Sequence, residues 1–216
     1  MINLKKGKMS HPSGRRNALN DFSGSEWAQS SKSVMQYEDQ RSQKQRLHGA
    51  AFPESLAAHQ ILIYTKQGDT VLDPFVGVGT TLDACMATGR NGIGIELNRQ
   101  FVELAQQDLA KAPLTGTTQK IICDDARHLL RHVEPESVNF VLTSPPYADM
   151  LKKIQNQFLY KWRDYGFRPI ENVRPYSDDP NDIGNLPYDE CLDALEQMLH
   201  DTYTVLKPSS YAAWVV

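Results

Sequence analysis

The sequence has little cysteine, and its three cysteines do not suggest pairing. Cys85, Cys123 and Cys191 are an odd number without CxxC spacing, so buried reduced thiols are expected rather than disulfides or a zinc site. The chain also lacks any apolar run near the ~20 residues of a membrane helix, and no apolar stretch follows the basic N-terminus. Secretion and membrane insertion are therefore disfavoured, and a cytoplasmic location is expected.

No charge of one sign dominates, but the charge is unevenly distributed. The formal net charge is −3 over 216 residues. Residues 1–48 contain nine Lys or Arg against four Asp or Glu, whereas residues 49–216 contain fourteen against twenty-two. With 40% hydrophobic and 23% charged residues, the composition is that of a globular protein and excludes disordered or collagen-like classes. We expect a basic polar arm over 1–47 and one domain over 48–216.

A second basic region lies within the expected domain. Residues 148–176 contain six basic and three acidic residues, with aromatic residues interleaved. Cations that follow phosphates and rings that stack on bases suit a single-stranded or flipped nucleic-acid segment. A solvated amphipathic helix that covers the core is an equally good interpretation. The candidate nucleic-acid contacts are Lys152, Lys153, Lys161, Arg163 and Arg168.

Apolar runs alternate with helical periodicity from residue 52 onward. Strands are predicted at 71–75, 92–96, 120–123, 138–142 and 211–216. Helices are predicted from 53 to 68, from 80 to 89, after Asn98, and from Asp189 onward. The last helix is expected to place Leu192, Leu195, Leu199 and Leu206 on one side, as its apolar face. This alternation predicts an α/β fold with a mostly parallel sheet and helices on both faces.

Glycine and acidic residues follow the first two predicted strands, at the edge where open parallel sheets bind ligands. After the first strand comes DPFVGVGTT (73–81), in which Gly77 and Gly79 allow close backbone approach and the next helix offers free N–H groups. The GxGxxG and Gly-Lys-Ser/Thr spacings are missing, so NAD and ATP are disfavoured. Glu96 ends the second strand, where an acid binds ribose hydroxyls or is simply solvated.

Polar residues also follow the third and fourth strands. Asp124 and Asp125 end the third, where a carboxylate either accepts from an exocyclic amine or caps a helix. Two prolines in Ser144-Pro145-Pro146-Tyr147 remove two N–H donors, which leaves a rigid loop of acceptors. Such a loop can hold the amine of a base, whose lone pair is delocalised into the ring, while Tyr147 stacks on the extruded base.

In combination, DPFVGVGTT, GIGIELN, CDDAR and TSPPY resemble the S-adenosylmethionine-dependent amino-methyltransferases of DNA, which modify cytosine N4 or adenine N6. The resemblance covers about residues 48–216. It implies a Rossmann-like methyltransferase fold, S-adenosyl-L-methionine as cofactor, no metal, and double-stranded DNA with a flipped base as substrate. It implies catalysis by Ser144, Pro145, Pro146 and Tyr147. It implies cofactor binding by Phe52, Pro53, Ser55, Asp73, Pro74, Phe75, Gly77, Gly79, Thr80, Thr81, Glu96, Leu97, Asp125 and Ala126.

The serine of TSPPY is more typical of cytosine-N4 enzymes, so cytosine N4 is the expected target. Adenine N6, an RNA or protein-amide methyltransferase, and a non-catalytic binding module of the same fold are the alternatives. Residues 148–187 are the expected target-recognition insertion, and a cognate restriction endonuclease is an expected partner.

Two features depart from the family pattern. The cofactor segment precedes SPPY, whereas many cytosine-N4 enzymes have the reverse order. The chain also stops in an apolar strand (212–216), before the helix and hairpin that usually complete this fold, so the fold is expected to be C-terminally incomplete. A fragment, completion by a partner or by the N-terminal arm, and a reduced relative remain open explanations.

Overall fold

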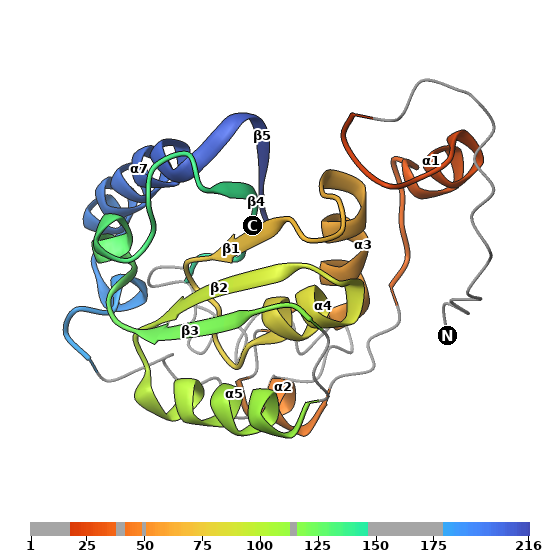
Figure 1. The fold of residues 1–216 in the computed structure, drawn as a ribbon. Coiled ribbons are helices and arrows are strands. Elements are labelled where there is room, and N and C mark those ends of the chain that lie inside the picture. The colour runs from red at the N-terminus through yellow and green to blue at the C-terminus, as the bar shows by residue number, and fades with distance from the viewer. Residues whose placement is uncertain (1–17, 38–41, 49–50, 113–115, 147–178) are drawn as a thin grey trace, which may run out of the picture.

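A five-stranded, all-parallel sheet forms the centre of the molecule (Figure 1). The structure is a computed structural model that describes residues 18–37, 42–48, 51–112, 116–146 and 179–216. The strand order is β3-β2-β1-β4-β5. The strands are β1 (Thr70–Asp73), β2 (Asn91–Glu96), β3 (Gln119–Cys123), β4 (Val138–Thr143) and β5 (Leu206–Trp214). The predicted Rossmann-like α/β fold is confirmed.

Four longer helices connect or precede these strands, and local chemistry sets several of their ends. They are α3 (Glu54–Tyr64), α4 (Thr80–Thr88), α5 (Arg99–Lys111) and α7 (Tyr188–Val205). Gly79 and Gly89 flank α4 in the left-handed conformation that glycine tolerates. Asn98 caps α5 by accepting a hydrogen bond from the Gln100 N–H, as the sequence predicts.

Two apolar clusters cover opposite faces of the sheet because successive strand residues point to opposite sides. Leu72 and Val141 face the cluster formed with α7 and with the short 3-10 helix η1 (Ala126–Arg131). Their neighbours Val71 and Phe140 face the cluster formed with α3 and α4. The sheet is thus covered on both faces, and its strand ends stay available for a site.

The apolar face predicted for the last helix is wrong. Leu192 and Leu199 are 46% and 51% exposed, whereas Cys191, Met198 and Val205 are buried. Leu195 is half-buried, and Leu206 packs at the edge of the core. The helix carries two neighbouring apolar stripes, and contact with η1 decides which one is buried. Helical periodicity alone cannot make that choice.

All three cysteines are free, as expected, but only two of them are buried. Cys123 is exposed because it ends β3, which lies at an edge of the sheet. β5 forms the opposite edge, and Tyr211 on it is 47% exposed. Within residues 18–37 and 42–48 the arm contributes two helices and adds no strand to the sheet.

The described part of the arm is anchored to the domain. Its helices are α1 (Gly24–Ser30) and α2 (Gln43–His48). Asn20 donates to the Ile63 carbonyl at 2.6 Å, and Lys44 lies 2.6 Å from the Asp83 carboxylate. The division into an arm (1–47) and a domain (48–216) stays a prediction. Among the residues placed by the structure, no helix combines the length and apolarity needed to cross a membrane.

Candidate active site

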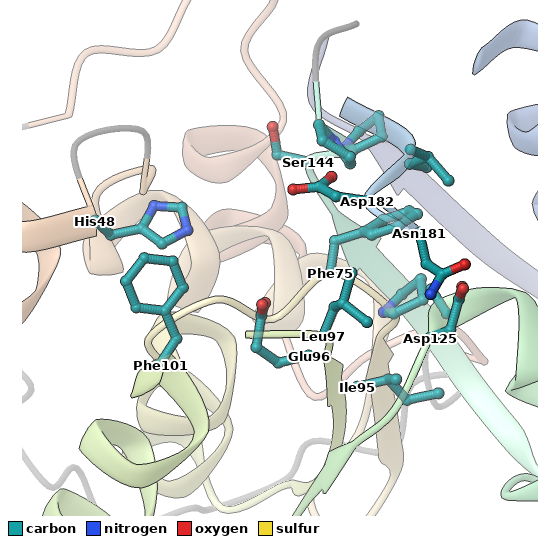
Figure 2. A pocket seen from close by; sticks show the side chains of 15 residues that line it. His48, Phe75, Ile95, Glu96, Leu97, Phe101, Asp125, Ser144, Asn181 and Asp182 are labelled. Carbon is teal, nitrogen blue, oxygen red and sulfur yellow. The ribbon is translucent and has the colours of Figure 1, made fainter. Parts of the chain in front are cut away.

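A pocket of about 670 Å³, open to solvent, lies at the carboxyl ends of β1, β2 and β4 and beyond β3 (Figure 2). Lining residues directly follow β1, β2 and β4, and after β3 they begin with Asp125. The lining residues are His48, Pro74, Phe75, Ile95, Glu96, Leu97, Phe101, Asp125, Ala126, Ser144, Pro145, Pro146, Asn181, Asp182 and Ile183. This is the edge at which open parallel sheets bind their ligands.

The carboxylate of Glu96 is held on both oxygens by backbone N–H groups. Gly77 N–H donates to Oε2 at 2.9 Å, and Asn98 N–H donates to Oε1 at 2.7 Å. Burial raises the pKa of Glu96 to about 7; these two hydrogen bonds oppose the shift, and the charges of Asp182 and Asp73 add to it. Each oxygen keeps a lone pair, so the fixed carboxylate can accept two hydroxyl groups of a ligand.

Asp73 lies under the glycine loop and does not line the pocket. Its carboxylate accepts hydrogen bonds from the Thr81 hydroxyl at 2.5 Å, the Thr143 hydroxyl at 2.6 Å and the Phe75 N–H at 3.0 Å. Burial raises the pKa of Asp73 to about 6, although all three hydrogen bonds lower it. Asp73 therefore joins the glycine loop, the start of α4 and the end of β4 into one unit.

Helix α2 of the arm closes one side of the pocket. The ring of His48 packs against Phe101 with 4.8 Å between centroids, and burial lowers its pKa to about 4. A methyl group on Gly77 would meet His48 Nε2 at 2.8 Å, so glycine is required for this close approach. Gln45 is buried and donates to the Thr80 hydroxyl at 3.1 Å, which ties α2 to α4.

Asp125 both lines the pocket and caps η1. Its carboxylate accepts from the Arg127 backbone N–H at 2.9 Å and pairs with the Arg127 guanidinium at 2.6 Å. The same guanidinium donates to the Asn181 carbonyl at 2.9 Å. Asp125 therefore caps a helix and also lines the pocket, so capping does not exclude contact with the exocyclic amine of a ligand. Asp124 lies outside the main pocket, where hydrogen bonds from His128 and His132 hold its pKa well below the usual range.

Ser144 lies where β4 ends, and its hydroxyl is already engaged as a donor. Oγ donates to the Val215 carbonyl at 2.9 Å. Pro145 and Pro146 line the pocket beside it without N–H groups of their own. Residues 144–146 therefore offer this part of the pocket wall oxygen acceptors and no proline N–H donors.

The structure brings nine of the expected site residues together in the pocket wall. They are Pro74, Phe75, Glu96, Leu97, Asp125, Ala126, Ser144, Pro145 and Pro146. Five others do not line the pocket: Asp73 ends β1, Gly77 and Gly79 lie in the loop after it, and Thr80 and Thr81 begin α4. Phe52 packs on the core, Pro53 precedes α3, and Ser55 lies in its first turn.

Some expected residues lie outside the described part of the chain, and some lining residues were not expected. Tyr147, Lys152, Lys153, Lys161, Arg163 and Arg168 are outside the described residues. The sequence did not point to Ile95, Phe101, Asn181, Asp182 or Ile183. Phe101 was detectable, since it lies in the first turn after the Asn98 cap. Residues 181–183 lie in the segment 148–187 that was expected to recognise the target, but they follow no predicted strand, so the sequence did not place them in the pocket wall.

The fold and the site define a class. A parallel sheet of order 3-2-1-4-5, a glycine loop after β1 and an acid after β2 make this a Rossmann-like α/β domain with a pocket suited to a nucleoside.

Comparison with known proteins narrows the class to a family. The N6/N4 methyltransferase family, described as DNA methylase, matches residues 3–107. This segment includes the glycine loop and Glu96 but not TSPPY. The match covers just under half of the chain, so this part is similar to the DNA methylases of the N6/N4 family, and the similarity supports S-adenosylmethionine as the cofactor.

Individual relatives agree with the family match. The type II methyltransferase M.HpaI of Haemophilus parainfluenzae is 44% identical over 62 residues, 29% of this chain and 20% of that protein. M.MthZI of Methanothermobacter thermautotrophicus is 48% identical over 61 residues, 28% of this chain and 17% of that protein. The matched segments thus span about a fifth of these relatives. Their activity is considered for this chain only as a proposal.

A solved structure of an S-adenosylmethionine-dependent methyltransferase from Aquifex aeolicus superposes with a TM-score of 0.45 and 14% identity. The superposition covers 81% of this chain and 72% of that one. At this level of likeness nothing further follows from it.

Proposed function

We propose that this chain carries the cofactor site and catalytic loop of a DNA methyltransferase that acts on the exocyclic N4 amine of a flipped cytosine. The observation that carries the proposal is one pocket with Glu96, fixed by two N–H groups, on one side and Ser144, Pro145 and Pro146 on another. The fixed carboxylate of Glu96 suits the hydroxyls of a ribose, and the acceptors of Ser144 and the prolines suit the N–H groups of an amine. A methyltransferase needs both within reach of one methyl group.

The residues of the pocket match the parts of S-adenosylmethionine. Glu96 would accept the ribose hydroxyls, and Leu97, Asp125 and Ala126 would surround the adenine. His48, which approaches Gly77 so closely that a side chain there would collide with it, would lie beside the methionine part. The bound cofactor supplies an electrophilic methyl group on a sulfonium.

Ser144 would act as an acceptor rather than as a base. Its hydrogen is donated to the Val215 carbonyl, so toward an amine its oxygen would act as an acceptor, and the carbonyl of Pro145 would add a second acceptor. Two acceptors on the N–H groups favour a pyramidal nitrogen with a localised lone pair. Alignment of that lone pair with the methyl group supplies much of the remaining rate, since good positioning can be worth roughly 7–11 kcal/mol.

Cytosine is proposed over adenine because the loop begins with serine, which is more typical of cytosine-N4 enzymes. Adenine N6 is the second candidate, because the matched family acts at both atoms. Lys152, Lys153, Lys161, Arg163 and Arg168 are proposed as DNA contacts, with residues 148–187 as the recognition insertion and Tyr147 stacked on the flipped base; these roles rest on the sequence. A cognate endonuclease is a proposed partner.

Calorimetric titration with S-adenosylmethionine tests the cofactor half of the proposal. Wild-type protein should bind it, and Glu96→Gln should bind it at least about tenfold more weakly, because one of the two buried acceptor oxygens for hydroxyls is replaced by an NH2 donor. Glu103→Gln, on the adjacent helix but outside the pocket, is the matched control and should bind normally. Equal affinity for all three proteins would contradict the assignment of Glu96.

A further inference from the structure

A short segment that no sequence motif marked forms one wall of the pocket. Asn181, Asp182 and Ile183 line it together with Ser144 and Glu96. Asp182 is only 6% exposed, and its negative charge helps to raise the pKa of Glu96, so the two carboxylates are close enough to interact. In Figure 2 the Asp182 carboxylate lies at the same end of the pocket as Ser144, with Glu96 deeper.

The position of Asp182 is fixed from several sides. Its Oδ1 accepts from the Gly184 N–H at 2.8 Å and so caps the short 3-10 helix η3 (Ile183–Asn185). Arg127 holds the Asn181 carbonyl just before it, and buried Ile183 anchors the residue just after it. The capping hydrogen bond and the two anchored neighbours thus fix the Asp182 carboxylate in the pocket wall.

The chemistry of the proposed function leaves one task without a residue. An amine that gains a methyl group must lose a proton. Ser144 gives its own hydrogen to Val215, and two prolines have only carbonyls, which do not take up protons. Asp125 is paired with Arg127, and His48 packs on Phe101 at the far side of the pocket. Glu96 is assigned to the ribose, so Asp182 is the remaining titratable side chain among these lining groups, and it shares the pocket wall with Ser144.

We propose that Asp182 is a further catalytic residue, whose carboxylate accepts a hydrogen bond from the target amine and then its proton. The inference rests on the proposed function. The nitrogen lone pair forms the new bond to the methyl carbon while the carbon–sulfur bond breaks, and its electron pair stays on sulfur. The proton on nitrogen moves to the carboxylate oxygen of Asp182 and from there to water.

Asp182→Asn separates this role from a structural one. Asparagine caps as well as aspartate, so the hydrogen bond from Gly184 is kept while the proton acceptor is lost. Asp179→Asn is the matched control, because Asp179 likewise accepts from a backbone N–H of the segment, that of Asn181 at 2.8 Å, but does not line the pocket. Single-turnover rates between pH 5 and 9 and cofactor affinities by calorimetry are measured for both variants and wild type.

We expect Asp182→Asn to reduce the rate about 10²–10⁴-fold across this pH range, the usual contribution of a positioned general base. Its cofactor affinity should stay within about threefold of wild type, as should both quantities for Asp179→Asn. A wild-type rate in Asp182→Asn would show that Asp182 only caps η3. A loss of cofactor affinity without a loss of rate would show that Asp182 binds the cofactor. Either result overturns this inference while the wild-type activity upholds the proposed function. No methyl transfer by the wild type would overturn both.

Discussion

The hydroxyl of Ser144 donates a 2.9 Å hydrogen bond to the carbonyl oxygen of Val215, 71 residues further along the chain. Val215 is placed there because its own N–H donates to the Thr143 carbonyl at 2.8 Å, which continues the pairing of β4 with β5. The end of β5 therefore sets which way the Ser144 hydroxyl points, and it makes Ser144 an acceptor for any ligand in the pocket.

Ser144→Ala should lower turnover by about 10²-fold while cofactor affinity is unchanged, because an acceptor for the amine is lost but no proposed cofactor contact. Single-turnover kinetics and calorimetry check both values. Ser137→Ala is the matched control, since it removes a hydroxyl that also donates to a carbonyl, that of Glu134, at an exposed position. Equal losses of turnover and affinity in Ser144→Ala would contradict the role given to Ser144.

Glu96 should make the stability of the protein depend on pH. Its pKa of about 7 in the fold lies above the ordinary 4.5, so its contribution to stability is fully present below pH ~4.5 and is lost as the pH rises through ~7. Glu96→Gln removes this loss. Between pH 5 and 9 the free energy of unfolding should shift in favour of the variant by about 2 kcal/mol. Urea titrations without cofactor measure it, and parallel pH curves for the two proteins would refute the account.

Gly77→Ala should weaken cofactor binding about tenfold or more, because the new methyl group would meet His48 at 2.8 Å and the backbone has φ +55°. Gly68→Ala is the control, since φ is +85° there but nothing lies within 4 Å. Calorimetry compares the two variants: backbone strain from a positive φ would affect both, whereas the collision with His48 would affect Gly77→Ala alone. If the two variants bind equally well, the approach of His48 to the loop does not shape the pocket.

Lys152 and Lys153 are proposed to contact phosphate. Replacing both with Ala should weaken DNA binding at low salt and reduce the steepness of log K against log salt by about 1.8, since each phosphate contact contributes ~0.9. Lys111 and Lys120, both exposed on the described domain, provide the control double variant. An unchanged salt slope in the first pair would exclude these lysines as phosphate contacts.

The strand-end motifs predicted the pocket because parallel strands bring their carboxyl ends to one edge. Residues as far apart as Phe75 and Ser144 could therefore be placed in one site from the sequence. The buried face of α7 could not, because Leu192 and Met198 are equally apolar and only the contact with η1 distinguishes their stripes. Asp182 could not either, since it reaches the pocket through Arg127 and its own capping bond rather than by following a strand.

The most direct test is to incubate the protein with methyl-labelled S-adenosylmethionine and DNA of mixed sequence, digest the DNA to nucleosides and identify the labelled product by mass spectrometry. The account predicts labelled N4-methylcytosine, absent with Ser144→Ala at short times. Labelled N6-methyladenine would keep the pocket and contradict the choice of base. Cofactor binding without any labelled nucleoside would contradict the claim that this chain methylates DNA.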